Sequence, residues 1–215
     1  MALLFGVGFI GFGAGGGFGS GGVLNFLGEN KEGGNATFGK QVSAAQKRIT
    51  RHPKEPAAWA ALTEAQLHQA SEGQYYDQET EKYTDKGKEL LSKVARSWST
   101  YLSLEQHNPS TALAKQMFGR VFSEIGLNQP SQAVQSLEII VEAEPTNWSW
   151  YTQLAAFAYK ANNPREGDLA SGKAVSLAPA SERKTLKQKL EEVKKNPSGL
   201  TGGSTAATGG ATPGG

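Results

Sequence analysis

The 215-residue chain has no cysteine, and this excludes disulfides, thiolate zinc sites, iron–sulfur ligation and cysteine nucleophiles. An excess of one charge is also lacking. The 22 Lys and Arg residues are balanced by 20 Asp and Glu, and a net charge of +2 gives no overall argument for binding nucleic acid. We therefore predict no nucleic-acid partner.

Recognisable catalytic motifs are scarce. The sequence has no G-x-S-x-G, no G-x-x-x-x-G-K-[ST] and no H-E-x-x-H, and its three histidines show no metal-binding spacing. The glutamates at 138, 142 and 144 are interpreted as a solvated helix face. We predict no catalytic residue, no metal ligand and no cofactor, so an enzyme is the least favoured class.

One glycine motif needs a separate interpretation. Residues 6–11 fit G-x-G-x-x-G, but a dinucleotide site requires a preceding strand and a following helix whose amino terminus holds the pyrophosphate. Here the motif leads into FGAGGGFGSGG, which has too much glycine for a soluble helix. The context argues against nucleotide binding.

Glycine is concentrated at the two ends of the chain. Of the 27 glycines, 13 lie in residues 1–37 and 7 in residues 196–215. The middle is ordinary in composition and long enough to bury a core. We therefore divide the chain into a hydrophobic Gly-rich segment (1–28), a linker (29–37), a helical domain (38–195) and a disordered Gly/Ser/Thr tail (196–215).

The first segment carries no charged side chain from residue 1 to residue 28. A bilayer requires roughly 20 apolar residues in a helix, and hydrocarbon forces even a glycine-rich chain to pair its backbone groups. We predict a single membrane anchor. The alternatives are a disordered arm on a soluble interaction module and, least favoured, a cleaved signal peptide, because no basic n-region precedes the apolar stretch.

The spacing of small residues in this segment bears on self-association. Gly11, Gly15 and Gly19 form a Gly-xxx-Gly face, and Gly13, Gly17 and Gly21 form another; such faces let two membrane helices approach closely. The flanking charges, Lys31 and Lys40 against Glu29 and Glu32, leave open on which side of the membrane the rest of the chain lies.

The middle shows a repeated helical pattern punctuated by proline. Pro109, Pro145 and Pro179 each follow an apolar helix end and are spaced 36 and 34 residues apart. Proline cannot continue a helix, so this recurrence predicts tandem helical hairpins. A further helix end at Pro53 predicts half a repeat from about Phe38.

The last hairpin, residues 151–179, is the clearest. Tyr151, Leu154 and Ala155 are followed by Gly167, Ala174 and Pro179, and this order resembles the tetratricopeptide repeat (TPR). Asn162 stands where the family commonly has glycine. The preceding unit matches the same repeat pattern at Phe118, Gly119, Phe122, Gly126, Ala133 and Pro145. The first unit follows the pattern less closely and contains a polar insertion at 71–84.

This resemblance covers residues 38–179 and implies an all-α fold, an α-solenoid of about three TPR-like hairpins with a C-terminal capping helix. Small residues, Gly119 among them, would lie where paired helices cross, and Trp98, Phe122 and Tyr151 would face inward. The cap is predicted at 181–195, with Ser181 as N-cap and Leu186, Leu190 and Val193 along one apolar stripe.

The chain as a whole resembles uncharacterised membrane-anchored TPR proteins of bacteria, above all of actinobacteria. The resemblance implies a single-pass bacterial membrane protein acting as a scaffold or adaptor for a protein or peptide partner. The family's groove positions fall on residues of the first helix in each hairpin: Glu64, His68, Gln116, Arg120, Ser123, Glu124, Ser149, Thr152, Tyr159 and Lys160. The Lys/Asn carboxylate clamp of some relatives is absent, because Ala60 and Glu64 replace it.

Overall fold

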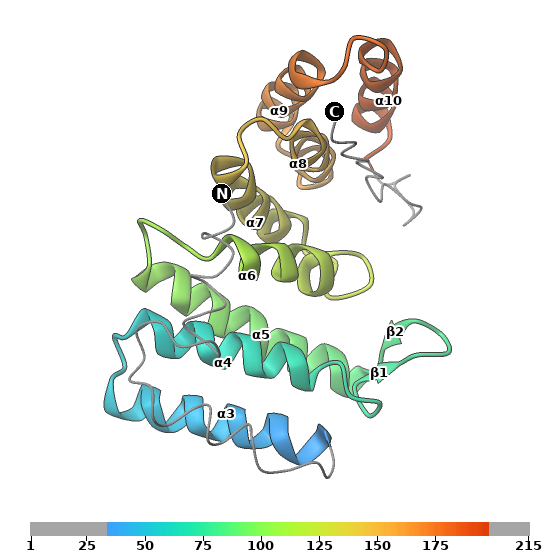
Figure 1. Ribbon diagram of the computed structural model, residues 1–215. Helices are drawn as coiled ribbons and strands as arrows, with labels where there is room; N and C mark the ends of the chain where they lie inside the picture. The colour runs from blue at the N-terminus through green and yellow to red at the C-terminus, as the bar shows by residue number, and fades with distance from the viewer. Residues whose placement is uncertain (1–33, 198–215) are drawn as a thin grey trace, which may run out of the picture. The chain divides into compact units, whose positions relative to one another are not determined.

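The computed structural model describes the backbone of residues 34–197 and the side chains of residues 38–197 (Figure 1). The predicted anchor, the first part of the linker and nearly all of the predicted tail lie outside these residues. The chain divides into two compact units between Gln129 and Pro130, called unit 1 and unit 2 below. Within the described residues the fold is all-helical apart from one small hairpin, so the predicted class is confirmed.

The described part of unit 1, residues 34–129, contains three long helices, a β-hairpin and a short helix that continues as a π-helical turn. Helix α4 packs against α3 on one side and α5 on the other, and the three lie side by side (Figure 1). The described elements are α3 (Gly34–Arg51), α4 (Pro56–Gln69), β1 (Tyr76–Asp77), β2 (Lys82–Tyr83), α5 (Asp85–Leu104), α6 (Thr111–Gln116) and η1 (Met117–Phe122).

Apolar side chains from these helices fill the interior of unit 1. Trp98 and Phe122 are 2% and 1% exposed, so both face inward as the resemblance led us to expect. One buried polar bridge links two helices, because the Ser97 hydroxyl donates a 2.9 Å hydrogen bond to Oε1 of Gln66. A buried polar pair of this kind is stable only when both groups are satisfied, so the bridge fixes α5 against α4.

The polar insertion at 71–84 folds as an antiparallel β-hairpin. Tyr76 pairs with Tyr83, and their rings meet edge to face at 5.0 Å. Thr84 is the N-cap of α5, and its hydroxyl accepts a hydrogen bond from the backbone amide of Gly87. A β-carbon at Gly87 would overlap the carbonyl of Tyr75. Glycine at position 87 therefore lets the hairpin close onto the first turn of α5.

The predicted place of Gly119 is wrong. Gly119 is exposed, and a β-carbon there would meet nothing within 4 Å. It lies in η1, where i→i+5 hydrogen bonding widens the turn and shifts each side chain around the axis relative to an α-helix. The shift buries Met117, Val121 and Phe122 and turns Gly119 outward.

Unit 2 contains four helices: α7 (Pro130–Ala143), α8 (Trp148–Lys160), α9 (Pro164–Leu177) and α10 (Arg183–Lys195). Helix α8 packs against α7, α9 and α10. Small residues make close packing possible, because Ala133, Ala155 and Ala174 are all fully buried, as expected for helix crossings.

The turn between α8 and α9 depends on Asn162. Its φ is 59°, in the left-handed region that glycine adopts freely and asparagine tolerates better than most residues. The next residue, Asn163, is the N-cap of α9, and its side-chain oxygen accepts a hydrogen bond from the backbone amide of Glu166. Asparagine at 162 thus supplies the left-handed backbone conformation that this turn requires.

Helix α10 has the predicted apolar stripe, with Leu186, Leu190 and Val193 buried. The predicted N-cap is wrong, since α10 begins at Arg183 and its N-cap position is Glu182. The backbone amides of Glu182 and Arg183 both donate hydrogen bonds to the carbonyl of Pro179. Ser181 therefore lies within this tight turn, before the helix begins.

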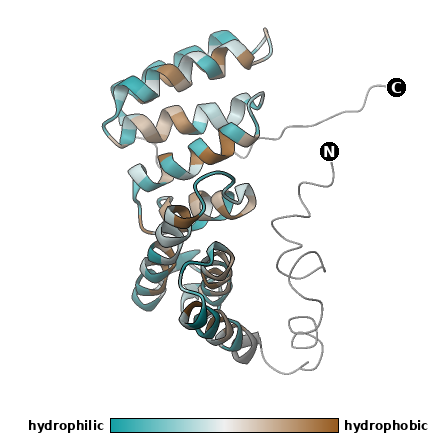
Figure 2. Ribbon diagram, turned by 90° about the vertical axis from the view of Figure 1, so that its left-hand side faces the viewer, coloured by the Kyte–Doolittle hydropathy of each residue, from teal (hydrophilic) through white to brown (hydrophobic). Residues whose placement is uncertain are grey.

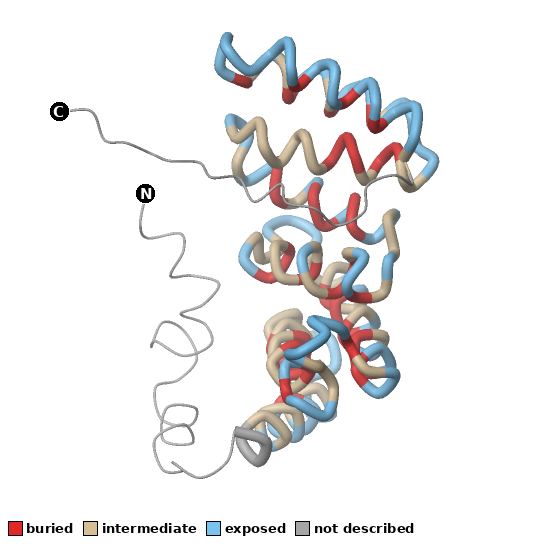
Figure 3. The backbone as a smooth tube through the Cα atoms, turned by 90° about the vertical axis from the view of Figure 1, so that its right-hand side faces the viewer, coloured by how far each residue is buried: buried red, intermediate tan, exposed pale blue. Residues whose placement is uncertain are grey.

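Each predicted proline follows a helix end: Pro53 after α3, Pro109 after α5, Pro145 after α7 and Pro179 after α9. In each unit the buried residues lie along the faces where helices adjoin, and polar residues cover the outward faces (Figures 2 and 3). The division at Gln129 falls inside the second predicted hairpin, whose first helix belongs to unit 1 and second to unit 2. Stacking of all hairpins into one solenoid stays a prediction.

Candidate functional site

Two predicted groove residues, Glu64 and His68, lie one turn apart on α4 and are half-buried. Burial raises the pKa of the Glu64 carboxyl to about 7, because low-dielectric surroundings disfavour its charged form. Neither hydrogen bond nor ion pair joins the Glu64 carboxylate to another side chain within residues 38–197. The carboxyl is therefore a partly desolvated acceptor that a bound group could satisfy.

The imidazole of His68 contacts an aromatic ring and feels the positive charge of Arg120. It stacks on Phe38 of α3, with ring centroids 5.4 Å apart and an interplanar angle of 12°. Burial lowers the pKa of His68, and the charge of Arg120 lowers it further, so the ring is neutral at physiological pH. A neutral imidazole can both donate and accept a hydrogen bond.

Arg120 comes from η1, more than 50 residues further along the chain. Its Nη2 donates a 2.9 Å hydrogen bond to the carbonyl of Leu67 and another to the hydroxyl of Ser71. These contacts place a guanidinium at the carboxyl end of α4, where the helix dipole favours positive charge. The structure therefore brings together His68 and Arg120, which were predicted in different repeats.

We call the surface formed by Phe38, Glu64, His68 and Arg120 the α4–η1 face. The other predicted residues of unit 1 contribute less to it. Gln116 is half-buried where α6 gives way to η1, and the Ser123 hydroxyl donates to the carbonyl of Gly119 at 2.8 Å. Glu124, also predicted, is exposed just after η1. π-Helical turns are frequent at functional sites, and here one carries Arg120.

The predicted residues of unit 2 are placed differently. Ser149 and Thr152 are half-buried on α8, and the Thr152 hydroxyl donates to the carbonyl of Trp148. Lys160 is half-buried at the end of α8. Tyr159 is only 7% exposed, and its hydroxyl donates a 2.7 Å hydrogen bond to Oδ1 of Asp168 on α9.

The surroundings of Tyr159 are those of a packing residue. Lys194 of α10 donates to the same Asp168 oxygen at 2.6 Å and lies 5.9 Å from the Tyr159 ring centroid. Burial raises the pKa of Tyr159 to about 12, and the hydrogen bond to Asp168 acts in the same direction. The hydrogen bond from Lys194 and that from Tyr159 lower the pKa of Asp168. This network joins α8, α9 and α10.

A pair of carboxyl groups in unit 2 has no counterpart in the sequence analysis. Glu138 of α7 hydrogen-bonds with Glu166 of α9, and its pKa is raised to about 7 by burial and then by the neighbouring carboxylate. The predicted cluster of 138, 142 and 144 is divided, since Glu144 accepts a 2.8 Å hydrogen bond from the indole of Trp150. The raised pKa of Glu138 means that its carboxyl group can hold a proton and donate it to Glu166.

Residues 38–197 contain no group of three or more His, Asp or Glu side chains able to hold a metal ion. Within residues 34–197, none of the helices combines the length and apolar character that crossing a bilayer demands. Comparisons with protein-family models, with curated proteins and with solved structures give no significant match to this chain.

Proposed function

We propose that this chain is a bacterial membrane-anchored scaffold or adaptor of TPR type, which binds a protein or peptide partner and catalyses no reaction. Its anchor is the uncharged segment 1–28, and its binding domain is the helical region 38–195. The proposal joins the repeat resemblance to the helical packing of both units, in which α4 with α5 and α8 with α9 form adjacent pairs.

The observation that carries the proposal is the α4–η1 face. A desolvated carboxyl, a neutral imidazole and a guanidinium lie on one surface, although they come from helices assigned to different repeats. Together they can accept and donate hydrogen bonds along an extended chain, as helical-repeat surfaces do when they bind peptides.

Two features of unit 2 support the repeat interpretation. Ala155 and Ala174 are fully buried at positions where the repeat has small residues, and Asn162 adopts a left-handed conformation where the repeat has glycine. We assign the partner surface first to unit 1, because Tyr159 of unit 2 is occupied by internal contacts.

Photocrosslinking in cells tests partner binding. A photoreactive residue at Glu64 should give a discrete adduct, which His68→Ala weakens. The matched control is the same photoreactive residue at Glu89, which is exposed on α5. Equal adducts from both positions, or none from Glu64, would argue against a partner on the α4–η1 face.

Membrane fractionation tests the anchor. The full chain should sediment with membranes, resist extraction by high salt and alkaline carbonate, and be released by detergent. Recovery in the supernatant without detergent would favour the soluble interaction module instead.

A further inference from the structure

Helix α3 carries several basic residues and contains no acidic residue that would balance their charge. From Gly34 to Lys54 the chain has Lys40, Lys47, Arg48, Arg51 and Lys54 and no acidic residue. The chain as a whole is nearly neutral, so this concentration is local. It begins inside the predicted linker (29–37), shortly after the segment predicted as anchor.

Three of the four basic residues of α3 lie on one face of the helix. Residues at steps of seven and four fall within about 40° of one another around an α-helix, and this spacing aligns Lys40, Lys47 and Arg51. All three are exposed. The opposite face is apolar, where Val42, Ala45 and Ile49 pack against Ala61 and Leu62 of α4. Packing against α4 therefore turns the three basic side chains outward.

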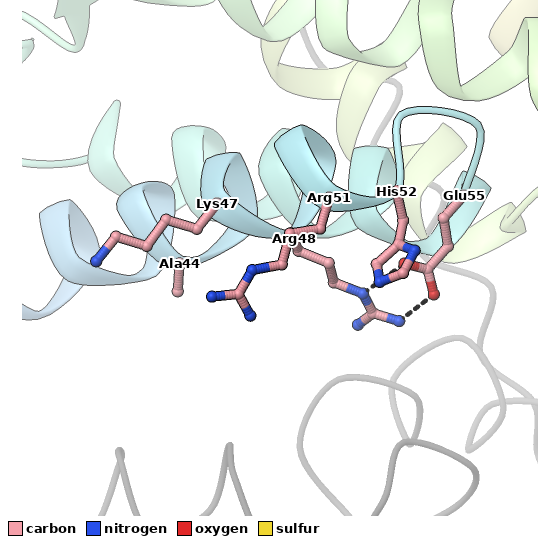
Figure 4. Close-up of a pocket in the computed structure, with 6 residues that line it drawn as sticks. All are labelled: Ala44, Lys47, Arg48, Arg51, His52 and Glu55. Carbon is pink, nitrogen blue, oxygen red and sulfur yellow. Dashed lines mark hydrogen bonds and ion pairs between the residues drawn. The ribbon is translucent and has the colours of Figure 1, made fainter.

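A pocket lies at the carboxyl end of this basic face. It has a volume of about 480 Å³ and is lined by Ala44, Lys47, Arg48, Arg51, His52 and Glu55. Figure 4 shows these side chains projecting from α3 and from the loop that follows it. Glu55 is the single acid of the six.

The acid is already paired within the pocket. Nε of Arg48 donates a 2.7 Å hydrogen bond to Glu55, and the other arm of the guanidinium donates to the second carboxylate oxygen. This two-point contact lowers the pKa of Glu55, and the charge of His52 contributes in the same direction. The Glu55 charge is thus balanced by Arg48, and Lys47 and Arg51 give the pocket its net positive charge.

We propose that this surface, called the α3 basic face (Lys40, Lys47, Arg51 and the pocket beside them), lies on the anionic phospholipid headgroups of the membrane. A guanidinium matches the geometry of phosphate, and each basic side chain held at an anionic bilayer raises the affinity about fivefold. The inference rests on the proposed anchor, which would keep the helix near lipid.

The length of the connection supports lipid as the occupant. Helix α3 begins at Gly34, six residues after the uncharged stretch ends at Gly28. Six residues span at most about 20 Å when fully extended. With the anchor inserted, the basic face stays close to the headgroups, whereas a soluble polyanion would have to reach it at the membrane surface.

The absence of cysteine makes a direct test possible in the full chain. Ala44 is exposed and lines the pocket, so a single cysteine there (Ala44→Cys) can carry a fluorescent probe. The labelled chain is reconstituted into neutral phosphatidylcholine vesicles or into vesicles with about 30 mol% phosphatidylglycerol. Quenching by a headgroup-attached quencher reports how closely the pocket approaches the surface.

The proposal expects stronger quenching in the anionic vesicles, with loss of the difference in about 0.5 M salt, where screening is nearly complete. The double variant Lys47→Gln with Arg51→Gln should lower about 25-fold the ratio of chains whose α3 lies on the vesicle surface to chains whose α3 lies away from it. The matched control, Lys184→Gln with Lys187→Gln on exposed positions of the basic helix α10, should leave the quenching unchanged.

Equal quenching in both lipids, or quenching unaffected by the Lys47/Arg51 pair, would overturn the proposal. So would a probe that responds to added duplex DNA and not to anionic vesicles, which would assign the face to nucleic acid. Flotation of the same vesicles in alkaline carbonate examines the anchor alone. A chain that floats without charge-dependent quenching disproves only the headgroup contact, and a chain that fails to float disproves the anchor.

Discussion

The ring of Tyr159 occupies the space that a β-carbon would need at Gly167. Tyr159 lies on α8 and Gly167 in the first half of α9, so these two residues set how closely the helices approach. The same ring is fixed at its far end by the hydrogen bond to Asp168. Glycine at 167 is therefore a packing requirement, although glycine weakens a helix.

We expect Gly167→Ala to destabilise the protein by about 1–3 kcal/mol, because the added methyl displaces the Tyr159 ring. Gly172→Ala is the matched control in the same helix. Position 172 is exposed and a β-carbon there meets nothing within 4 Å, so alanine should stabilise by roughly 0.5–1 kcal/mol. Chemical denaturation of both variants measures the difference, and equal effects would contradict it.

The turn at Asn162 gives a second stability prediction. Asn162→Val should cost about 1–2 kcal/mol, since a β-branched side chain is strained at a φ of 59°. Asn162→Gly should be neutral or slightly stabilising, because glycine adopts this conformation without strain. Urea unfolding midpoints of the two variants should differ in this order, and the reverse order would rule out a left-handed turn.

The carboxyl pair predicts how stability depends on pH. The pKa of Glu138 is about 7 in the folded chain and near 4.5 ordinarily, so folded protein holds a proton that unfolded protein releases. The free energy of unfolding should therefore fall as pH rises from about 4.5 to just above 7. Glu64, whose pKa is also raised to about 7, adds to this slope in unit 1.

Glu138→Gln should flatten that slope, because an amide keeps a hydrogen bond to Glu166 without titrating. Glu142→Gln, exposed on the same helix, is the control and should leave the slope as it is. Thermal unfolding followed at several pH values gives the comparison. A slope that Glu138→Gln does not change would show that the pair shares no proton.

Arg120 and His68 give an electrostatic prediction that does not depend on any ligand. Arg120→Ala removes a charge that lowers the pKa of His68, so the pKa of His68 should rise, while the burial contribution remains. NMR titration of the histidine resonances measures it, with His52 as internal control. The variant should also lose about 1–3 kcal/mol, because two hydrogen bonds to the end of α4 disappear.

The helical class and most helix ends could be predicted from local chemistry. Proline blocks helix continuation whatever surrounds it, and the helices end just before Pro53, Pro145 and Pro179 as expected. The apolar stripe of Leu186, Leu190 and Val193 has helical spacing in the sequence itself, and these residues are buried in α10. Such features depend only on neighbours within a few residues.

Features that depend on tertiary contacts were missed. The π-helical turn that exposes Gly119 cannot be distinguished by spacing from the α-helix that the repeat pattern implies. The repeat resemblance predicts Tyr159 as a groove residue, but its neighbours Gly167, Asp168 and Lys194 come from other helices and bury it. The pairing of Glu138 with Glu166 joins residues 28 positions apart that no local pattern connects.

Both terminal helices of the described chain are strongly basic. Helix α3 has four basic side chains and no acidic one, and α10 has six basic against two acidic. Two copies of the chain that met through these helices, α3 of one against α10 of the other, would bring like charges together. Electrostatic repulsion therefore opposes self-association through this pair of helices, and added salt would weaken that repulsion.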